Sequence, residues 1–370
     1  MTAATMDFEI CPTSRPLPAA ERDAVLEEPG FGQTFTDHMV TLRWSAERGW
    51  HDGRLEPYGA FTLEPATSVF HYGQALFEGM KAYRQPDGAV TLFRPDANAA
   101  RFNASARRMA MPELPPELFV KAVELLVAHD RAWVPEGAGR SLYLRPFMIA
   151  TDPSLGFTHP SRTFLFCVVA SPATAYFGGG PPKSLAVWLS TTFTRAVRGG
   201  TGYAKTGGNY AGAFAAGLEA TAHGCDQVVW LDAMEHRWVE EMGGMNLFFV
   251  RAQRGGRPRV TTPPLTGTLL PGITRDSLLT LAPKLGYDAV ESPVSVEQWR
   301  EECASGELTE VFACGTAAVI APVGTVKSEN GQWTVADGEP GPVTLRLRRE
   351  LLGIQHGSAP DPEGWVHHVR

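Results

Sequence analysis

The chain lacks the sequence features that mark exported, membrane-spanning and metal-clustered proteins. Its five cysteines are widely scattered and include no Cys-x-x-Cys pair of the kind found at metal or redox sites, which favours a reducing, cytoplasmic setting. Residues 1–9 contain neither a basic nor an apolar segment, and no later stretch approaches about 18 uninterrupted apolar residues. We therefore expect no export signal, no membrane association and no metal site. Repeats and low-complexity tracts are also missing.

Composition and charge describe an ordinary globular protein. Of 370 residues, 44% are hydrophobic and 20% are charged, and the formal net charge is -7. This balance does not indicate nucleic-acid binding or disorder. The length exceeds the usual size of one domain, so two domains that share or flank a cleft are expected.

The order of strand-like and helix-like segments suggests where the domains divide. Residues 1–35 show no clear period and are expected to form an N-terminal arm. Residues 36–177 alternate strand and helix patterns and predict a small α+β domain. A Gly-Gly-Gly-Pro-Pro run makes 178–183 the expected interdomain loop, and 184–370 would form the larger domain. The fold class is thus α+β or α/β, in two domains.

The most informative segment is a glycine-rich loop around one lysine. Lys205 lies within residues 199–210, which contain five glycines. Glycines remove side-chain bulk, so a ligand can approach the backbone closely. Two chemistries fit such a loop: formation of a Schiff base by the lysine amine, and binding of phosphate.

A nucleotide-binding phosphate loop is the competing interpretation. Residues 199–206 nearly match the pattern Gly-x4-Gly-Lys-Ser/Thr, and the apolar strand before Asp232 imitates a magnesium-binding strand. The pattern fails at Ala204, where glycine is needed, and two glycines after the lysine would weaken the helix that should begin there. We therefore regard a nucleotide hydrolase as the weaker alternative.

A pyridoxal cofactor needs a carboxylate, a hydroxyl and a phosphate site in addition to the lysine. Residues 271–275 lead into a helical pattern, so free backbone N–H groups at its start could face an anion. Glu240 and Glu241 end an alternating strand, which requires one of them to face inward. The pattern alone does not decide between the two glutamates.

Several motifs together closely resemble the branched-chain amino-acid aminotransferases, which are fold-type IV pyridoxal-phosphate enzymes. They are Phe-Glu-Gly-Met-Lys-Ala-Tyr at 77–83, Lys-Thr-Gly-Gly-Asn-Tyr at 205–210, Glu-Met-Gly-Gly-Met-Asn-Leu-Phe at 241–248 and Leu-Pro-Gly-Ile-Thr-Arg at 270–275. The resemblance runs from about residue 35 to residue 357. It implies a two-domain fold with the cofactor site at the domain interface, and a homodimer.

The resemblance also implies roles for particular residues. Lys205 would be the catalytic, Schiff-base lysine, and Glu241 the partner of the pyridine nitrogen, which leaves Glu240 as its outward-facing neighbour. The remaining cofactor-binding residues would be Tyr210, toward the phenolic oxygen, and the phosphate ligands Arg101, Ile273, Thr274 and Thr316. The substrate would contact Phe77, Tyr143, Arg145, Tyr176 and Ala317.

The expected activity follows from this resemblance. It is reversible transfer of the amino group of L-leucine, L-isoleucine or L-valine to 2-oxoglutarate, with pyridoxal 5'-phosphate as cofactor. A D-amino-acid aminotransferase or an aminodeoxychorismate lyase would use the same lysine and glutamate and stays an alternative. Some family members carry Cys-x-x-Cys after the Gly-Thr turn, but this chain has Ala-Val-Ile-Ala at 318–321, which excludes a thiol switch there.

Overall fold

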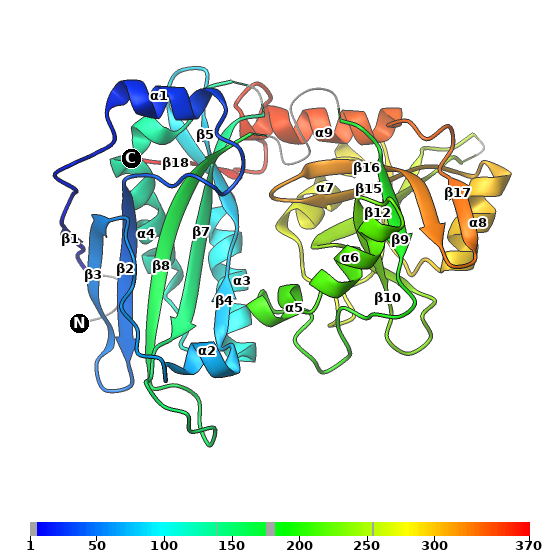
Figure 1. The fold of residues 1–370 in the computed structure, drawn as a ribbon. Coiled ribbons are helices and arrows are strands. Elements are labelled where there is room, and N and C mark those ends of the chain that lie inside the picture. The colour runs from blue at the N-terminus through cyan, green and yellow to red at the C-terminus, as the bar shows by residue number, and fades with distance from the viewer. Residues whose placement is uncertain (1–5, 138, 175–181, 254) are drawn as a thin grey trace. The chain divides into compact units, whose positions relative to one another are not determined.

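The chain folds into two compact units (Figure 1). The computed structural model describes residues 6–137, 139–174, 182–253 and 255–370. The first unit comprises residues 1–179, 204–207 and 353–370, and the second comprises 180–203 and 208–352. The contacts therefore group 204–207 and 353–370 with the first unit, whereas the sequence placed all of 184–370 in the larger domain. Most of the expected loop at 178–183 lies outside the described residues.

The first unit contains one sheet with helices packed on it. Its strands are β1 (Glu9–Ile10), β2 (His38–Ser45), β3 (Gly49–Pro57), β4 (Ala75–Phe77), β5 (Met80–Arg84), β6 (Val90–Phe93), β7 (Ser141–Ala150), β8 (Thr163–Ala173) and β18 (Val366–His368). Its helices are α1 (Ala19–Glu27), α2 (Ser68–Tyr72), α3 (Pro95–Arg108), α4 (Pro116–His129) and a 3-10 turn at Arg131–Trp133. The expected N-terminal arm thus contains β1 and α1.

The sheet of the first unit is nine-stranded among the described residues, in the order β1-β3-β2-β8-β7-β5-β6-β18, with β4 paired to β7. Helices α3 and α4 each begin with a proline, whose fixed φ suits the first helical position. Phe102 of α3 and Phe119 of α4 are fully buried and pack against Phe166 of β8, with ring centroids 5.3 to 5.9 Å apart. This aromatic group holds α3, and the residues it carries, against the sheet.

The second unit is built around a mixed sheet. Its strands are β9 (Leu185–Leu189), β10 (Gln227–Leu231), β11 (Val239–Met242), β12 (Met245–Arg251), β13 (Arg259–Thr262), β14 (Asp288–Glu291), β15 (Leu308–Gly315), β16 (Val319–Ser328) and β17 (Gly331–Thr334). Its helices are α6 (Phe214–Ala222), α7 (Ile273–Lys284) and α8 (Val296–Ser305), while α5 (Gly207–Ala211) and α9 (Pro342–Gln355) have residues in both units.

Strand pairing in the second unit closes on itself. Within the described chain the order is β11-β10-β9-β16-β15-β12-β13-β14, and β11 also pairs with β12. Strands β11, β10, β9, β16, β15 and β12 therefore form a closed circuit, which leaves no free edge on those strands. Its apolar core includes the fully buried Val187, Val229 and Leu247. In the described ranges no helix has the length and apolar character needed to cross a bilayer.

A buried ion pair fixes α3 to the turn between β4 and β5. Glu78 is fully buried, and its two carboxylate oxygens accept hydrogen bonds from Arg101 Nε and Nη2 at 2.7 and 2.8 Å. Asn98, one helical turn earlier, donates to the same carboxylate at 2.7 Å. Burial raises the pKa of Glu78, but the charges of Arg101 and Lys205 and the hydrogen bonds outweigh it, so that the pKa lies below the ordinary 4.5.

Glu78→Gln is expected to lower the free energy of unfolding by about 3–5 kcal/mol at pH 7, because it leaves the buried Arg101 guanidinium without its counter-charge. A lowered pKa in the folded state means that the stabilisation is present above pH 4.5 and is lost as the pH falls through the folded-state pKa. Urea unfolding followed by circular dichroism at several pH values measures both effects.

The matched control is Glu113→Gln, which breaks the exposed ion pair with Arg107. It should change stability by less than about 1 kcal/mol. Equal losses for the two variants, or a Glu78→Gln loss that does not diminish in acid, would show that the buried charge pair is not the source of the stabilisation.

Candidate active site

Lys205 is held in place by its backbone. Its carbonyl accepts a hydrogen bond from the N–H of Phe77 at 3.0 Å, and its own N–H donates to Ser105 Oγ on α3 at 2.9 Å. The hydroxyl of the next residue, Thr206, donates to the carbonyl of Ala75 on β4 at 2.7 Å. The loop is thus fastened to β4 and α3, and the Lys205 amino group lies 4.7 Å from the centre of the Phe77 ring.

Three of the expected substrate-binding residues, Phe77, Tyr143 and Arg145, contact one another, and Phe77 lies next to this lysine. The Arg145 guanidinium lies 4.7 Å from the centre of the Phe77 ring and 5.6 Å from that of Tyr143, and its Nη2 donates to the Tyr143 hydroxyl at 3.3 Å. Arg145 Nε is buried and has no hydrogen-bond partner among the described residues. A Cβ at Gly79 would come within 2.2 Å of the Tyr143 hydroxyl, so only glycine permits this arrangement.

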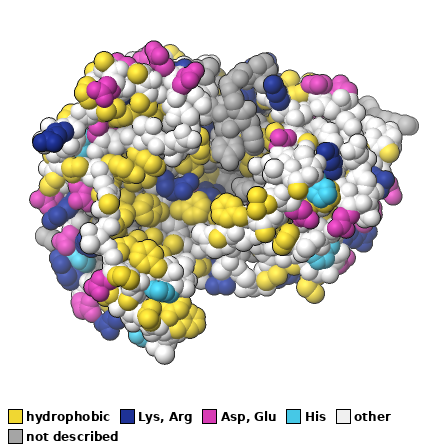
Figure 2. Space-filling model, in the orientation of Figure 1, with side chains coloured by type: hydrophobic (Ala, Val, Ile, Leu, Met, Phe, Trp, Pro, Cys, Tyr) yellow, Lys and Arg dark blue, Asp and Glu magenta, His cyan; other side chains and the backbone are white. Residues whose placement is uncertain are grey.

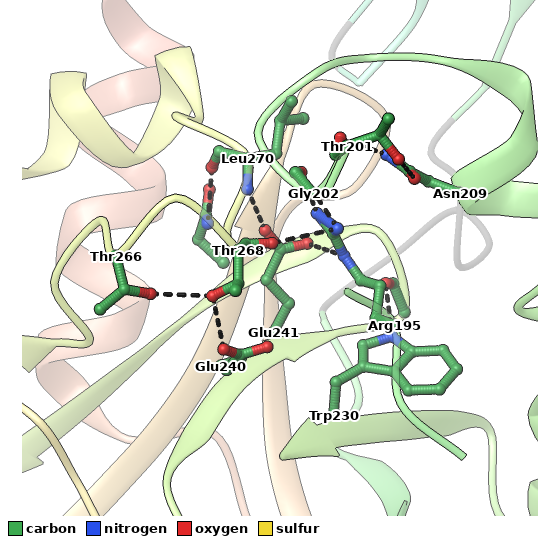
Figure 3. A network of polar contacts seen from close by, with 12 residues as sticks. Arg195, Thr201, Gly202, Asn209, Trp230, Glu240, Glu241, Thr266, Thr268 and Leu270 are labelled. Carbon is green, nitrogen blue, oxygen red and sulfur yellow. Dashed lines mark hydrogen bonds and ion pairs between the residues drawn. The ribbon is translucent and has the colours of Figure 1, made fainter. Parts of the chain in front are cut away.

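Glu241 is held by a set of contacts within the second unit (Figure 3). It is 1% exposed, and its Oε2 pairs with Arg195 Nε at 2.9 Å while Oε1 accepts the backbone N–H of Leu270. The same arginine also donates to the carbonyls of Gly202 and Thr268, at 3.0 to 3.3 Å. The Arg195 guanidinium therefore connects β11 to Gly202 of the glycine-rich loop and to Thr268 in the segment before α7.

The expectation that Glu240 faces outward is wrong. Its side chain leaves β11 on the side opposite to Glu241, yet it is only 6% exposed and accepts a hydrogen bond from the Thr268 hydroxyl (Figure 3). The reason is that the segment before α7 covers this face of the strand as well. Burial and the neighbouring Glu241 charge raise the pKa of Glu240. The Thr268 hydrogen bond lowers it by less, so the pKa lies above its ordinary value.

The expected anion site lies at the start of α7. This helix begins at Ile273 after Gly272, which is extended and provides no side-chain cap. Backbone N–H groups of a first helical turn, such as that of Thr274, have no partner within the helix and are oriented to bind an anion. A Cβ at Gly272 would lie 2.0 Å from Asn246 Oδ1, and Asn246 Nδ2 donates to the Leu270 carbonyl at 3.1 Å. These close contacts fix the helix start against β12.

The other expected residues are distributed over both units. Tyr210 is on α5, and a Cβ at Gly244 would touch its ring at 3.4 Å. Thr316 and Ala317 form the half-buried turn between β15 and β16. Arg101 is the buried partner of Glu78 in the first unit. Tyr176 lies outside the described residues.

Sequence reasoning missed Arg195 and the pairing of Glu78 with Arg101. Arg195 follows β9 and is 46 positions from Glu241, so nothing in its local sequence marks it. The structure also removes the basis of the nucleotide-binding alternative. Asp232 accepts backbone N–H groups from four residues of the turn that follows it, and so acts as a turn cap.

Comparison with known proteins shows the family of the chain. Residues 75–326 match the family model of the class IV amino-transferases. The chain is 57% identical to a probable branched-chain-amino-acid aminotransferase of Streptomyces coelicolor, over 98% of this chain and 99% of that protein. It is 52% identical to the branched-chain-amino-acid aminotransferase of Mycolicibacterium smegmatis, over 99% of both chains.

Solved structures show the same fold. The Escherichia coli branched-chain amino acid aminotransferase superposes with a TM-score of 0.74 at 27% identity, over 90% of this chain and 99% of that one. The Thermobaculum terrenum enzyme in its PLP-form gives a TM-score of 0.69 at 25% identity, over 89% of this chain and 98% of that one. The chain therefore belongs to the fold-type IV, class IV aminotransferases and, within them, to the branched-chain-amino-acid aminotransferase family.

Proposed function

We propose that this enzyme transfers the amino group of L-leucine, L-isoleucine or L-valine to 2-oxoglutarate, with pyridoxal 5'-phosphate as its cofactor. The activity follows from membership of the family, whose relatives match this chain along nearly its whole length. The observation within the molecule that supports it best is the Lys205 cluster. There the Lys205 amine and the Arg145 guanidinium both lie 4.7 Å from the centre of the Phe77 ring, and Arg145 is a cation suited to a substrate carboxylate.

The donor groups fit the proposed cofactor. An aldehyde requires an amine, which Lys205 provides; a pyridine nitrogen requires a carboxylate, which Glu241 provides; and a phenolic oxygen requires a hydroxyl such as that of Tyr210. For the phosphate, the uncapped start of α7 supplies the N–H groups of Ile273 and Thr274, and Arg101 and Thr316 complete the proposed ligands. When bound, the cofactor would supply a ring that withdraws electrons from the substrate α-carbon.

Each protein group then has one task in the proposed reaction. With the cofactor bound, the Lys205 amine would be the group that takes the proton from the substrate α-carbon and carries it during the transfer. Glu241 would hold the ring nitrogen of the cofactor, and Arg195 fixes the Glu241 carboxylate through the pairing at 2.9 Å. Because Arg195 is anchored to two backbone carbonyls, it constrains the direction of that carboxylate as well as offsetting its charge.

The substrate pocket must accept both an aliphatic side chain and the side-chain carboxylate of glutamate. The faces of Phe77 and Tyr143 offer apolar surface for the first. Arg145 offers a charged donor for the second, since its buried Nε has no hydrogen-bond partner in the described chain and its guanidinium is already oriented by the two rings. We further assign Tyr176 and Ala317 to the substrate side.

Lys205→Ala is expected to lower the rate of glutamate formation from L-leucine and 2-oxoglutarate by at least about 1000-fold, because the group that moves the α-proton is removed. Lys284→Ala, at the exposed end of α7, is the control and should keep the wild-type rate. Circular dichroism of both variants checks that they fold. Transamination by Lys205→Ala at near the wild-type rate would refute the assignment.

The visible absorption spectrum tests the cofactor and the substrate class in the same protein. A yellow protein that bleaches with L-leucine and recovers its colour with 2-oxoglutarate is the expected result. A yellow protein that responds only to D-amino acids would retain the cofactor but exclude the branched-chain activity. A protein that stays colourless after incubation with pyridoxal phosphate would exclude the cofactor.

We also propose that the enzyme is a homodimer, and an exposed apolar patch on the first unit supports this. The patch consists of Phe70 and Tyr72 on α2 and Leu155 and Phe157 on the loop after β7, with exposed fractions of 61%, 40%, 60% and 80%. The ring centroids of Tyr72 and Phe157 lie 5.0 Å apart with the rings tilted, and Figure 2 shows hydrophobic side chains gathered around this loop. Contiguous exposed apolar surface of this kind usually marks a protein interface.

The double substitution Leu155→Asp with Phe157→Asp should shift the protein from dimer toward monomer, since it places charges on the proposed apolar contact. Sedimentation velocity over a range of concentrations measures the shift. Leu345→Asp, on α9 and 40% exposed, is the control for adding charge to an apolar surface position and should leave the mass unchanged. An unchanged dimer in the double variant would exclude this patch from the interface.

A further inference from the structure

A cavity lies behind Glu241, on the opposite face of β11. It has a volume of about 590 Å³, and all of its lining residues belong to the second unit. Glu240 lines it, while Glu241, which leaves the strand on the other side, does not. This cavity is therefore separate from the face of β11 that the proposed cofactor site uses.

The cavity has a buried end and an open end. At the buried end Glu240, Thr268 and Leu269 are 6%, 5% and 3% exposed. At the open end Val197 and Met234 are 51% and 87% exposed. A small molecule could therefore enter from solvent and reach the Glu240 carboxyl. Between the two ends the wall is largely apolar and includes three prolines, at 263, 264 and 293.

The charges at the wall favour a cation. Among the described residues Glu240 has one hydrogen-bond partner, Thr268, which contacts a single carboxylate oxygen, so the second oxygen has none. The lining has three acidic side chains, of Asp232, Glu235 and Glu240, and one basic side chain, of Arg198. The carboxylate of Asp232 is already used by the turn that follows it. Glu235 is exposed at the opening, so Glu240 is the buried carboxyl that is available to a ligand.

From these observations we propose that the cavity binds a small organic cation, an ammonium group on a branched aliphatic body. The ammonium donates to the second Glu240 oxygen and adds an opposite charge inside the cavity, next to this buried carboxyl. The aliphatic body lies against Leu269 and the proline-rich wall, where its removal from water is favourable. This site does not depend on the proposed transamination.

Isothermal titration calorimetry of the cofactor-loaded enzyme with N,N-dimethyl-3-methylbutylamine tests the proposal. This probe has a branched aliphatic body, and its protonated form carries one N–H. Because it is a tertiary amine, it cannot condense with an aldehyde. We expect saturable binding, with one probe per chain. Its uncharged counterpart, 1-methoxy-3-methylbutane, should bind at least about 10-fold more weakly, because a hydrogen bond between charged groups is lost.

Two variants locate the bound probe. Glu240→Gln keeps the shape of the side chain and should weaken probe binding at least about 10-fold. Val197→Trp narrows the open end of the cavity and should abolish binding without touching the carboxyl. Glu235→Gln, an exposed acid at the same opening, is the control and should change the affinity by less than about threefold.

Three outcomes would overturn the proposal. They are the absence of binding heat with the wild-type enzyme, equal binding of the amine and the ether, and amine binding that both Glu240→Gln and Val197→Trp leave unchanged. The last outcome would place the probe elsewhere on the protein. Glutamate formation from L-leucine is measured on the same wild-type preparation, so that failure of the cavity and failure of the proposed activity are distinguished.

Discussion

The pairing of Arg195 with Glu241 is the interaction on which the second unit's part of the site depends. The guanidinium connects three segments that are distant in the chain: the region after β9, strand β11 and the residues before α7. Both partners are almost fully buried, so removing either would leave a charge without compensation. The pair is therefore a structural requirement of this fold as well as a means of directing the carboxylate.

The sequence allowed the chemistry-bearing motifs to be found, because each is local. The glycine-rich loop around Lys205 and the uncapped helix start at Ile273 can both be identified within about ten residues. The contacts that give these motifs their geometry are not local. Ser105, which fixes the Lys205 backbone, is 100 positions away, and Arg195 is 46 positions from Glu241. No short pattern contains that information, which is why Arg195 was missed.

The burial of a side chain was also harder to predict than the face of the strand from which it projects. Alternation along β11 placed Glu240 and Glu241 on opposite faces, as the structure shows. The usual inference, that the second face of such a strand meets water, was wrong because the segment before α7 covers it. Dividing the chain into consecutive domains also overlooks contacts between distant segments. Residues 204–207 contact α3 and β4, and β18, near the end of the chain, pairs with β6. The roles assigned to the site residues, Lys205 and Glu241 as well as Tyr210, Thr316 and Ala317, stay predictions.

Adjacent buried acids on one strand have a consequence for how β11 must pair. If this strand slipped by one residue, so that Glu240 took the place of Glu241, Glu241 would take the place of Met242 on the opposite face. The slip would also displace Val239 and Met242, which are buried in the apolar core of the second unit. The two-residue turn at Gly243 and Gly244 opposes it as well: Gly243 has a φ of 56°, donates its N–H to the Val228 carbonyl and accepts from the indole of Trp230. This turn thus helps to determine which of two identical side chains faces the proposed cofactor site.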